Sequence, residues 1–175
     1  MNFSQLLSQR GQLVRAKKGE HIYRQGDVDR HVYLLQSGLV KAYYLSSDGK
    51  EHVKSLLLSG AFIGSLTACH SKQQCSFSLI CLENSELYKL SFDDLRSLSR
   101  ENMEASQFLI DSLLELSMKK ERREYEFLCL SAEQRYRLLR EREPELIGRV
   151  TQNDIARYLG ITPVALSRIK ARLPC

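Results

Sequence analysis

Several features that would place this chain in other classes of protein are missing from its 175 residues. It has no run of 18 apolar residues, so it contains no candidate membrane span. Its first ten residues lack a charged start followed by an apolar stretch, so we expect no signal peptide and a cytoplasmic location. The five cysteines are odd in number, which fits a reducing compartment better than a disulfide framework.

Catalytic patterns are also missing. We find no Ser/His/Asp set and no phosphate-binding loop, and the four histidines are scattered along the chain. The sequence therefore predicts a protein that is not an enzyme and carries no metal or other cofactor. Tryptophan is absent as well, so tyrosine should dominate the intrinsic fluorescence.

The most informative segment that is present lies at the C-terminal end. Thr151 can cap a first helix, with Asp154 as its capping-box partner three residues later. Gly160 stands where that helix must end in a left-handed conformation. Thr162 can cap a second helix, with Pro163 at the first helical position, where no backbone donor is needed. This pattern predicts a helix-turn-helix, which places its second helix in the DNA major groove.

Charge favours the same interpretation. Residues 148–175 hold five basic residues and one acidic residue, a local excess of four positive charges in a chain of formal net charge +5. Such an excess is typical of a unit that binds the phosphate backbone, although a helical hairpin with a solvated basic face remains the alternative. We expect DNA contacts from Thr151, Gln152, Thr162, Pro163, Val164, Ser167, Arg168, Lys170 and Arg172.

The first hundred residues have a different pattern, in which short alternating runs are separated by glycines. Asp48-Gly49 is a strong hairpin turn between two of these runs. Regular short strands with turn signals predict a β-sandwich or β-roll, which we assign to residues 1–100. The expected strands are Leu13–Ala16, Glu20–Tyr23, His31–Gln36, Gly38–Leu45, Glu51–Leu57, Cys75–Cys81 and Ser85–Leu90.

Helical periodicity follows. Ser91 can cap a short helix over Phe92–Leu98, and a longer helix should cover about Met103–Tyr125. The longer helix is apolar on more than one side, which indicates that it is covered on both. We assign residues 101–125 to dimerisation, with a single helix that packs only within its own chain as the alternative. The expected dimer interface comprises Phe108, Leu109, Leu113 and Leu116.

Residues 126–175 should form the DNA-binding domain. Ser131 can cap a helix over Ala132–Glu143, and Pro144 is expected to end it. A strand remnant through Ile147–Val150 would make the domain resemble a winged helix. The fold class we expect is therefore α+β: an N-terminal β-roll, a long central helix and a C-terminal winged-helix-like helix-turn-helix domain.

The whole chain resembles the Crp/Fnr family of bacterial transcription regulators. The motifs that carry the resemblance run from Lys18-Gly19-Glu20 and Tyr33-x-Leu35-x-Ser37-Gly38 through Gly60-Ala61-Phe62-Ile63-Gly64 to Leu166-Ser167-Arg168-Ile169. The resemblance implies a β-roll like that of cyclic-nucleotide-binding proteins. It also implies a homodimer that reads palindromic DNA with two recognition helices, and RNA polymerase as a further partner.

One part of the motif departs from family members that bind cyclic AMP. Ser65 stands where they have the glutamate that binds ribose, and Cys75 where they have the arginine that binds the cyclic phosphate. A buried phosphate needs a cation or several donors, and the only full cation between Gly60 and Cys81 is Lys72. We therefore expect an effector pocket that does not use cyclic AMP, formed by Gly64, Ser65, Leu66, Lys72, Cys75 and Ser76.

Three cysteines in the sensor, Cys69, Cys75 and Cys81, could suggest an iron–sulfur or redox site. Their spacing matches no common iron–sulfur motif, and Cys75 and Cys81 alternate as core-facing strand residues.

The chain stops five residues after Lys170. That short end keeps a second function open: a small-ligand sensor with a vestigial DNA-binding domain that acts through protein partners.

Overall fold

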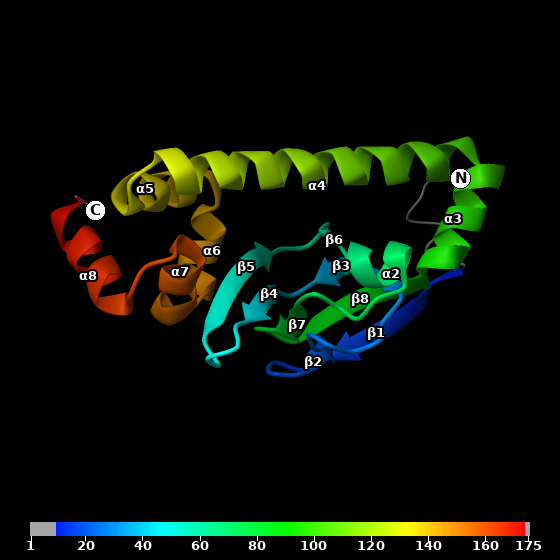
Figure 1. Cartoon of the computed structure of the whole chain (residues 1–175), viewed down its shortest axis with the longest axis horizontal. Coiled ribbons are helices and arrows are strands. Elements are labelled where there is room, and N and C mark those ends of the chain that lie inside the picture. Colours follow the sequence, from blue (N-terminus) through cyan, green and yellow to red (C-terminus); the bar gives the residue numbers. More distant parts are fainter. Residues whose placement is uncertain (1–9, 174–175) are drawn as a thin grey trace.

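The computed structural model describes residues 10–173, so the N-terminal stretch and Cys175 lie outside the described residues. A β-roll forms one end of the molecule and the last four helices of the chain form the other (Figure 1). One long helix, α4 (Met103–Cys129), runs along the side of both. The predicted order of roll, long helix and C-terminal helices is confirmed, and no helix among residues 10–173 is long and apolar enough to cross a membrane.

The roll consists of two antiparallel four-stranded sheets. One sheet has the order β1-β8-β3-β6 and the other β2-β7-β4-β5. All seven predicted strands are present, with ends that shift by up to three residues, and the two-residue strand β6 was not predicted. The strands are β1 (Gln12–Ala16), β2 (His21–Tyr23), β3 (His31–Ser37), β4 (Val40–Leu45), β5 (Glu51–Leu57), β6 (Phe62–Ile63), β7 (Ser78–Cys81) and β8 (Ser85–Ser91).

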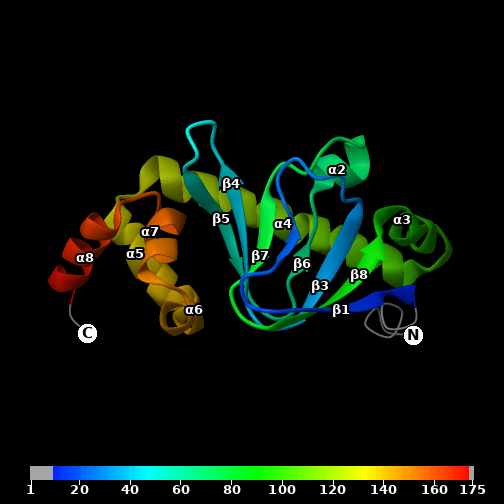
Figure 2. The same cartoon turned by 90° about the horizontal axis from the view of Figure 1, so that it is seen from below.

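Alternation places one face of each strand in the core between the sheets. In β3 the side chains of Tyr33 and Leu35 point inward, and they pack with Leu79 and Leu87 from other strands. The β4–β5 hairpin turns at Gly49, which has a φ of 78°, as the Asp48-Gly49 pair predicts. Its strand β5 lies on the side of the roll that faces the C-terminal helices (Figure 2).

Two helices flank the roll before the long helix begins. The short helix α2 (Leu66–Ser71) was not predicted, and α3 (Phe92–Glu101) is capped by Ser91 as expected. A second core cluster joins α3 to the roll, and the N-terminal part of α4 packs on it through Phe108 and Leu109. The helix α4 continues four residues beyond the predicted end at Tyr125.

The C-terminal part contains only helices among the described residues. These are α5 (Ala132–Arg142), α6 (Pro144–Arg149), α7 (Gln152–Leu159) and α8 (Pro163–Arg172). The expected strand at Ile147–Val150 is wrong, so the domain is not winged in the part described. Pro144 does end α5, but proline is also favoured at the first position of a helix, and here it starts α6.

Candidate nucleic-acid interface

The predicted helix-turn-helix is present with the predicted caps. The Thr151 hydroxyl accepts the backbone N–H of Asp154 at the start of α7, and the Thr162 hydroxyl accepts that of Ala165 at the start of α8. The Asp154 side chain departs from a capping box. It accepts the Thr151 hydroxyl at 2.7 Å and the Lys41 ammonium of β4 at 2.8 Å.

Gly160 ends the first helix of the pair. Its φ is 72°, a left-handed conformation, and its backbone N–H closes the end of α7. A Cβ atom at this position would lie 2.8 Å from the Phe127 ring of α4. Glycine is therefore required here both for conformation and for the close approach of α4.

We predict that Gly160→Ala lowers the free energy of unfolding by at least about 1–2 kcal/mol, the cost of a left-handed non-glycine residue. Chemical denaturation measures the effect. The matched control is Gly148→Ala, because Gly148 lies in α6 with open space where a Cβ would stand. The control should be neutral or slightly stabilising. Equal effects of the two changes would contradict this account of Gly160.

The reading helix α8 presents its polar face to solvent. Leu166 and Ile169 are buried in the core of the C-terminal domain. All nine residues predicted to contact DNA are exposed, from Thr151 to Arg172. Lys170 donates to Gln152 at 2.9 Å, which ties the two helices together across this face. Arg168 has no ion-pair partner within residues 10–173, so its guanidinium is available to a ligand.

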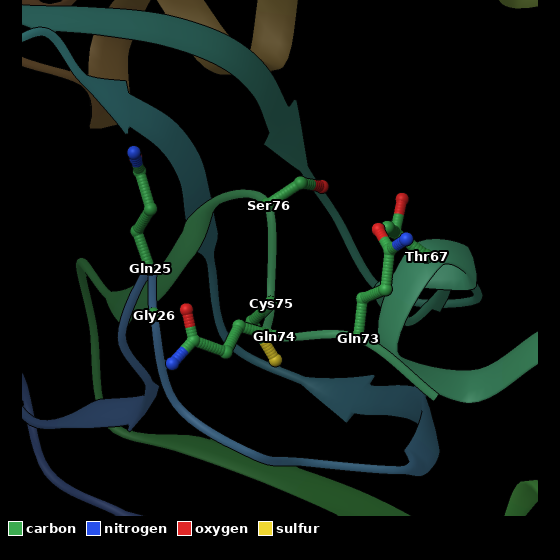
Figure 3. Close-up of a pocket in the computed structure, with 7 residues that line it drawn as sticks. All are labelled: Gln25, Gly26, Thr67, Gln73, Gln74, Cys75 and Ser76. Atoms are coloured by element: carbon green, nitrogen blue, oxygen red, sulfur yellow. The ribbon is translucent and has the colours of Figure 1, made fainter. Parts of the chain in front are cut away.

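Residues 64–76, which we call the effector cassette because they include all six residues predicted for the effector pocket, form a different kind of site. An open cavity of about 610 Å³ lies beside it, as Figure 3 shows. Of the six residues predicted for the effector pocket, Cys75 and Ser76 line this cavity and the other four do not. None of the lining residues is charged: Gln25, Gly26, Thr67, Gln73, Gln74, Cys75 and Ser76.

The remaining cassette residues have structural roles. The Ser65 hydroxyl, 1% exposed, accepts the backbone N–H groups of Ala68 and Ser76, which holds α2 against the strand that follows. Gly64 lies so close to β3 that a Cβ would stand 3.1 Å from Val32. Lys72 caps the end of α2 with a φ of 54° and is exposed. Spacing alone could not show this, because α2 was not foreseen.

The sequence analysis missed a cation that the fold brings into the sensor. The Lys54 ammonium of β5 lies 4.7 Å from the centre of the Phe77 ring. Burial, together with the charges of Lys120 and Arg123 on α4, lowers the pKa of Lys54 to about 8. The predicted inward orientation of Cys75 and Cys81 is confirmed, and burial raises the pKa of both thiols.

The four residues predicted for the dimer surface on α4 differ in exposure. Phe108 and Leu109 are partly buried, because α4 uses this side to cover the core that joins α3 to the roll. Leu116 is also partly buried, whereas Leu113 is 39% exposed. Among the exposed apolar side chains of α4, we call the following six the α4 stripe: Ile110, Leu113, Leu114, Met118, Tyr125 and Leu128.

Comparison with known proteins agrees with this arrangement. Residues 13–102 match the family model described as the cyclic nucleotide-binding domain. The fumarate and nitrate reduction regulatory protein of Vibrio cholerae is 30% identical over 183 residues, which cover 95% of this chain and 72% of that protein. The chain belongs to the Crp/Fnr family. A second Crp/Fnr relative, the fumarate and nitrate reduction regulatory protein of Yersinia pestis, is 26% identical over 167 residues; the match covers 89% of this chain, which spans 66% of that protein's length.

Solved structures give the same fold for Crp/Fnr proteins. FixK2 from Bradyrhizobium japonicum has a TM-score of 0.79 at 20% identity, and the match covers 93% of this chain and 84% of that one. The regulator CLP from Xanthomonas campestris has a TM-score of 0.78 at 22% identity, with 97% and 89% covered. These likenesses establish the fold of this chain.

Proposed function

We propose that this chain is a DNA-binding transcription regulator that acts as a homodimer on palindromic sites, with RNA polymerase as a further partner. One observation carries the proposal: the capped helix-turn-helix leaves its whole polar face exposed, with Arg168, Lys170 and Arg172 on it. Arginine is the residue best suited to read guanine, and the other cations suit phosphates. A regulator that binds DNA in a bacterium would act in the cytoplasm.

Selection of bound fragments from random double-stranded DNA tests this proposal. We expect the full chain to enrich one sequence with two-fold symmetry, with half-sites about one helical turn apart. Enrichment of no sequence would contradict it. That result would favour the alternative of a sensor module that acts through protein partners.

The proposal includes no resident metal and no catalysis. Within residues 10–173, no three histidine, cysteine or acidic side chains come together in a way that could hold a metal ion. Cys69, Cys75 and Cys81 are buried as small apolar groups in the roll and its flank. What supports a binding role is the sensor cavity, which offers amide and hydroxyl groups rather than charge.

We predict that cyclic AMP is not the effector. Ser65 and Cys75 replace two charged partners, and a hydrogen bond to a charged group contributes about 1.5–3 kcal/mol. Loss of both should weaken binding by roughly two to four powers of ten relative to family members that have them. Calorimetric titration of the full chain measures this. Micromolar binding of cyclic AMP that also raises DNA affinity would contradict the prediction, and Lys54 would then be the cation to examine.

A further inference from the structure

The helix-turn-helix is docked on the β-roll through an apolar contact. Leu39, in the turn between β3 and β4, is fully buried in the core of the C-terminal domain with Leu146 and Ile155. Arg149 of α6 reaches the same end of the roll, where it donates to both carboxylate oxygens of Glu83 at 2.7–2.9 Å. The core of the DNA-binding domain is thus completed by a residue of the sensor.

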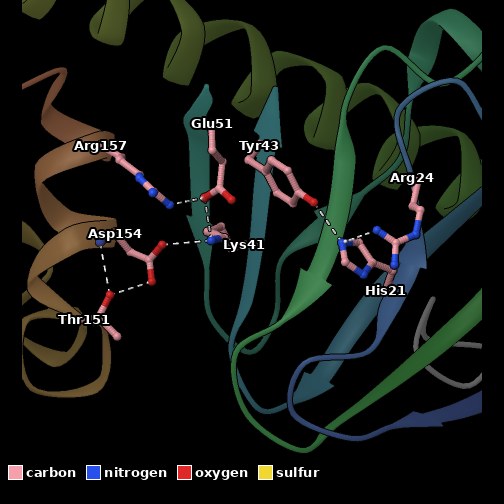
Figure 4. Close-up of polar contacts among 8 residues, drawn as sticks. All are labelled: His21, Arg24, Lys41, Tyr43, Glu51, Thr151, Asp154 and Arg157. Carbon is pink, nitrogen blue, oxygen red and sulfur yellow. Dashed lines mark hydrogen bonds and ion pairs between the residues drawn. The ribbon is translucent and has the colours of Figure 1, made fainter. Parts of the chain in front are cut away.

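A cluster of four charged residues lies beside this contact (Figure 4). The Lys41 ammonium of β4 donates to Asp154 Oδ1 of α7 at 2.8 Å and to Glu51 Oε1 of β5 at 2.7 Å. Arg157 of α7 donates to the same Glu51 oxygen at 3.2 Å. The sensor and the helix-turn-helix each contribute one cation and one anion. We call these four residues the interdomain cluster.

Burial makes the pairing of Lys41 with Asp154 necessary for the docked position of α7. The side chains of Lys41 and Asp154 are only 8% and 10% exposed. Burial alone would lower the pKa of Lys41, but its hydrogen bonds to Asp154 and Glu51 raise the pKa above the usual value. Without Lys41, the Thr151 hydroxyl is the one side chain among residues 10–173 that still donates to the Asp154 carboxylate, and a buried charge without a counter-charge is strongly unfavourable. Lys41 therefore favours one docked position of α7.

The cluster does not cover the reading face. Val164, Ser167 and Arg168 are exposed while α7 is docked on β5.

A second set of hydrogen bonds holds α7 in the same position. Arg123 of α4 donates to the carbonyl oxygens of Val53 in β5 and Tyr158 in α7, at 3.0 Å and 2.9 Å. The long helix, the sensor hairpin and the first helix of the helix-turn-helix are therefore joined at one point.

We propose that Lys41 and Glu51 are positioning residues for DNA binding, which hold α7 through Asp154 and Arg157 so that each protomer presents α8 at a fixed orientation. This inference rests on the proposed function of a dimer on a two-half-site operator. Two half-sites are engaged together only when both reading helices are held at matching positions. Looser docking lowers the effective concentration of the second reading helix at its half-site, and the contacts of a single helix with a single half-site do not change.

The test compares DNA with two half-sites and DNA with one, using the full chain. Lys41→Met removes the charge with little change in volume, and we expect it to weaken two-site binding by at least about tenfold and single-site binding less than twofold. The matched control is Lys50→Met. Lys50 lies in the same hairpin and pairs with Asp48 on the surface, so the control also removes one positive charge. It should affect both DNAs equally and weakly, and Lys41→Arg should recover part of the two-site affinity.

A second measurement reports docking without DNA. Hydrogen exchange of the α7 amides should become faster in Lys41→Met and in Asp154→Asn, and should stay at the wild-type rate in Lys50→Met. Unchanged exchange in both variants, a wild-type ratio of two-site to one-site affinity in Lys41→Met, or a gain in its two-site affinity would each overturn the inference. A wild-type chain that binds neither DNA would contradict the proposed function, and exchange would still decide the docking.

Discussion

Replacement of both Ile110 and Leu114 by glutamate should convert a dimer into monomers. Both side chains belong to the α4 stripe and are 49% and 56% exposed in the single chain, so the fold of the protomer should survive. Burial of the exposed half of a leucine or isoleucine contributes about 0.8–1.5 kcal/mol, half of the value for full burial, and four such side chains are lost per dimer. The dissociation constant of the dimer should rise by at least about a hundredfold. Sedimentation measures it, and affinity for two-half-site DNA should fall with it.

The control for this change is Arg122→Glu. Arg122 is exposed on the polar flank of α4, outside the α4 stripe, and its replacement changes the net charge by the same two units. It should leave the protein dimeric. A wild-type protein that is monomeric at micromolar concentration, or a double variant that stays dimeric, would show that the α4 stripe is not the interface.

Arg168→Ala should remove sequence preference while the fold is kept. Arg168 is exposed on α8, without an ion-pair partner within the described residues, and nothing in the core depends on it. One bidentate contact with guanine discriminates by about 1–3 kcal/mol, so affinity for the selected site should fall roughly five- to 150-fold. Affinity for unrelated DNA should fall much less. Fluorescence anisotropy with both DNAs measures the difference.

Arg172→Ala is the matched control, because Arg172 lies on the same helix one turn further on and is also exposed. We expect it to weaken selected and unrelated DNA by similar factors, as the loss of a phosphate contact does. If Arg168→Ala behaves in the same uniform way, Arg168 contacts phosphate and another residue reads the sequence.

Local signals predicted the elements of this fold well. The caps Thr151 and Thr162, the left-handed Gly160 and the Asp48-Gly49 turn depend on neighbours in the sequence, and all are present. Pro144 was ambiguous, because the same residue ends one helix and can start the next. Periodicity showed that α4 is apolar on more than one side. It could not show which side meets the roll, or that Phe108 and Leu109 pack in part against it.

The contacts between domains could not be predicted in this way. Lys41 and Asp154 are separated by 113 positions, and Asp154 already had a local interpretation as a capping residue. Leu39 looked like an ordinary strand residue, and Lys54 lies outside the cassette on which the pocket prediction relied. Such pairs depend on how complete domains pack, which short-range patterns do not encode.

The salt dependence of binding to the selected two-half-site DNA tests the central claim most directly. Each protomer presents Arg168, Lys170 and Arg172 on its exposed reading face, and two phosphate contacts per protomer would release about four counterions per dimer. We predict that the logarithm of the binding constant falls with the logarithm of salt concentration with a slope of about −3 or steeper, and that selected DNA stays at least about a thousandfold tighter than unrelated DNA. Binding that is insensitive to salt, or equal for the two DNAs, would contradict the claim that this chain is a sequence-specific DNA-binding regulator.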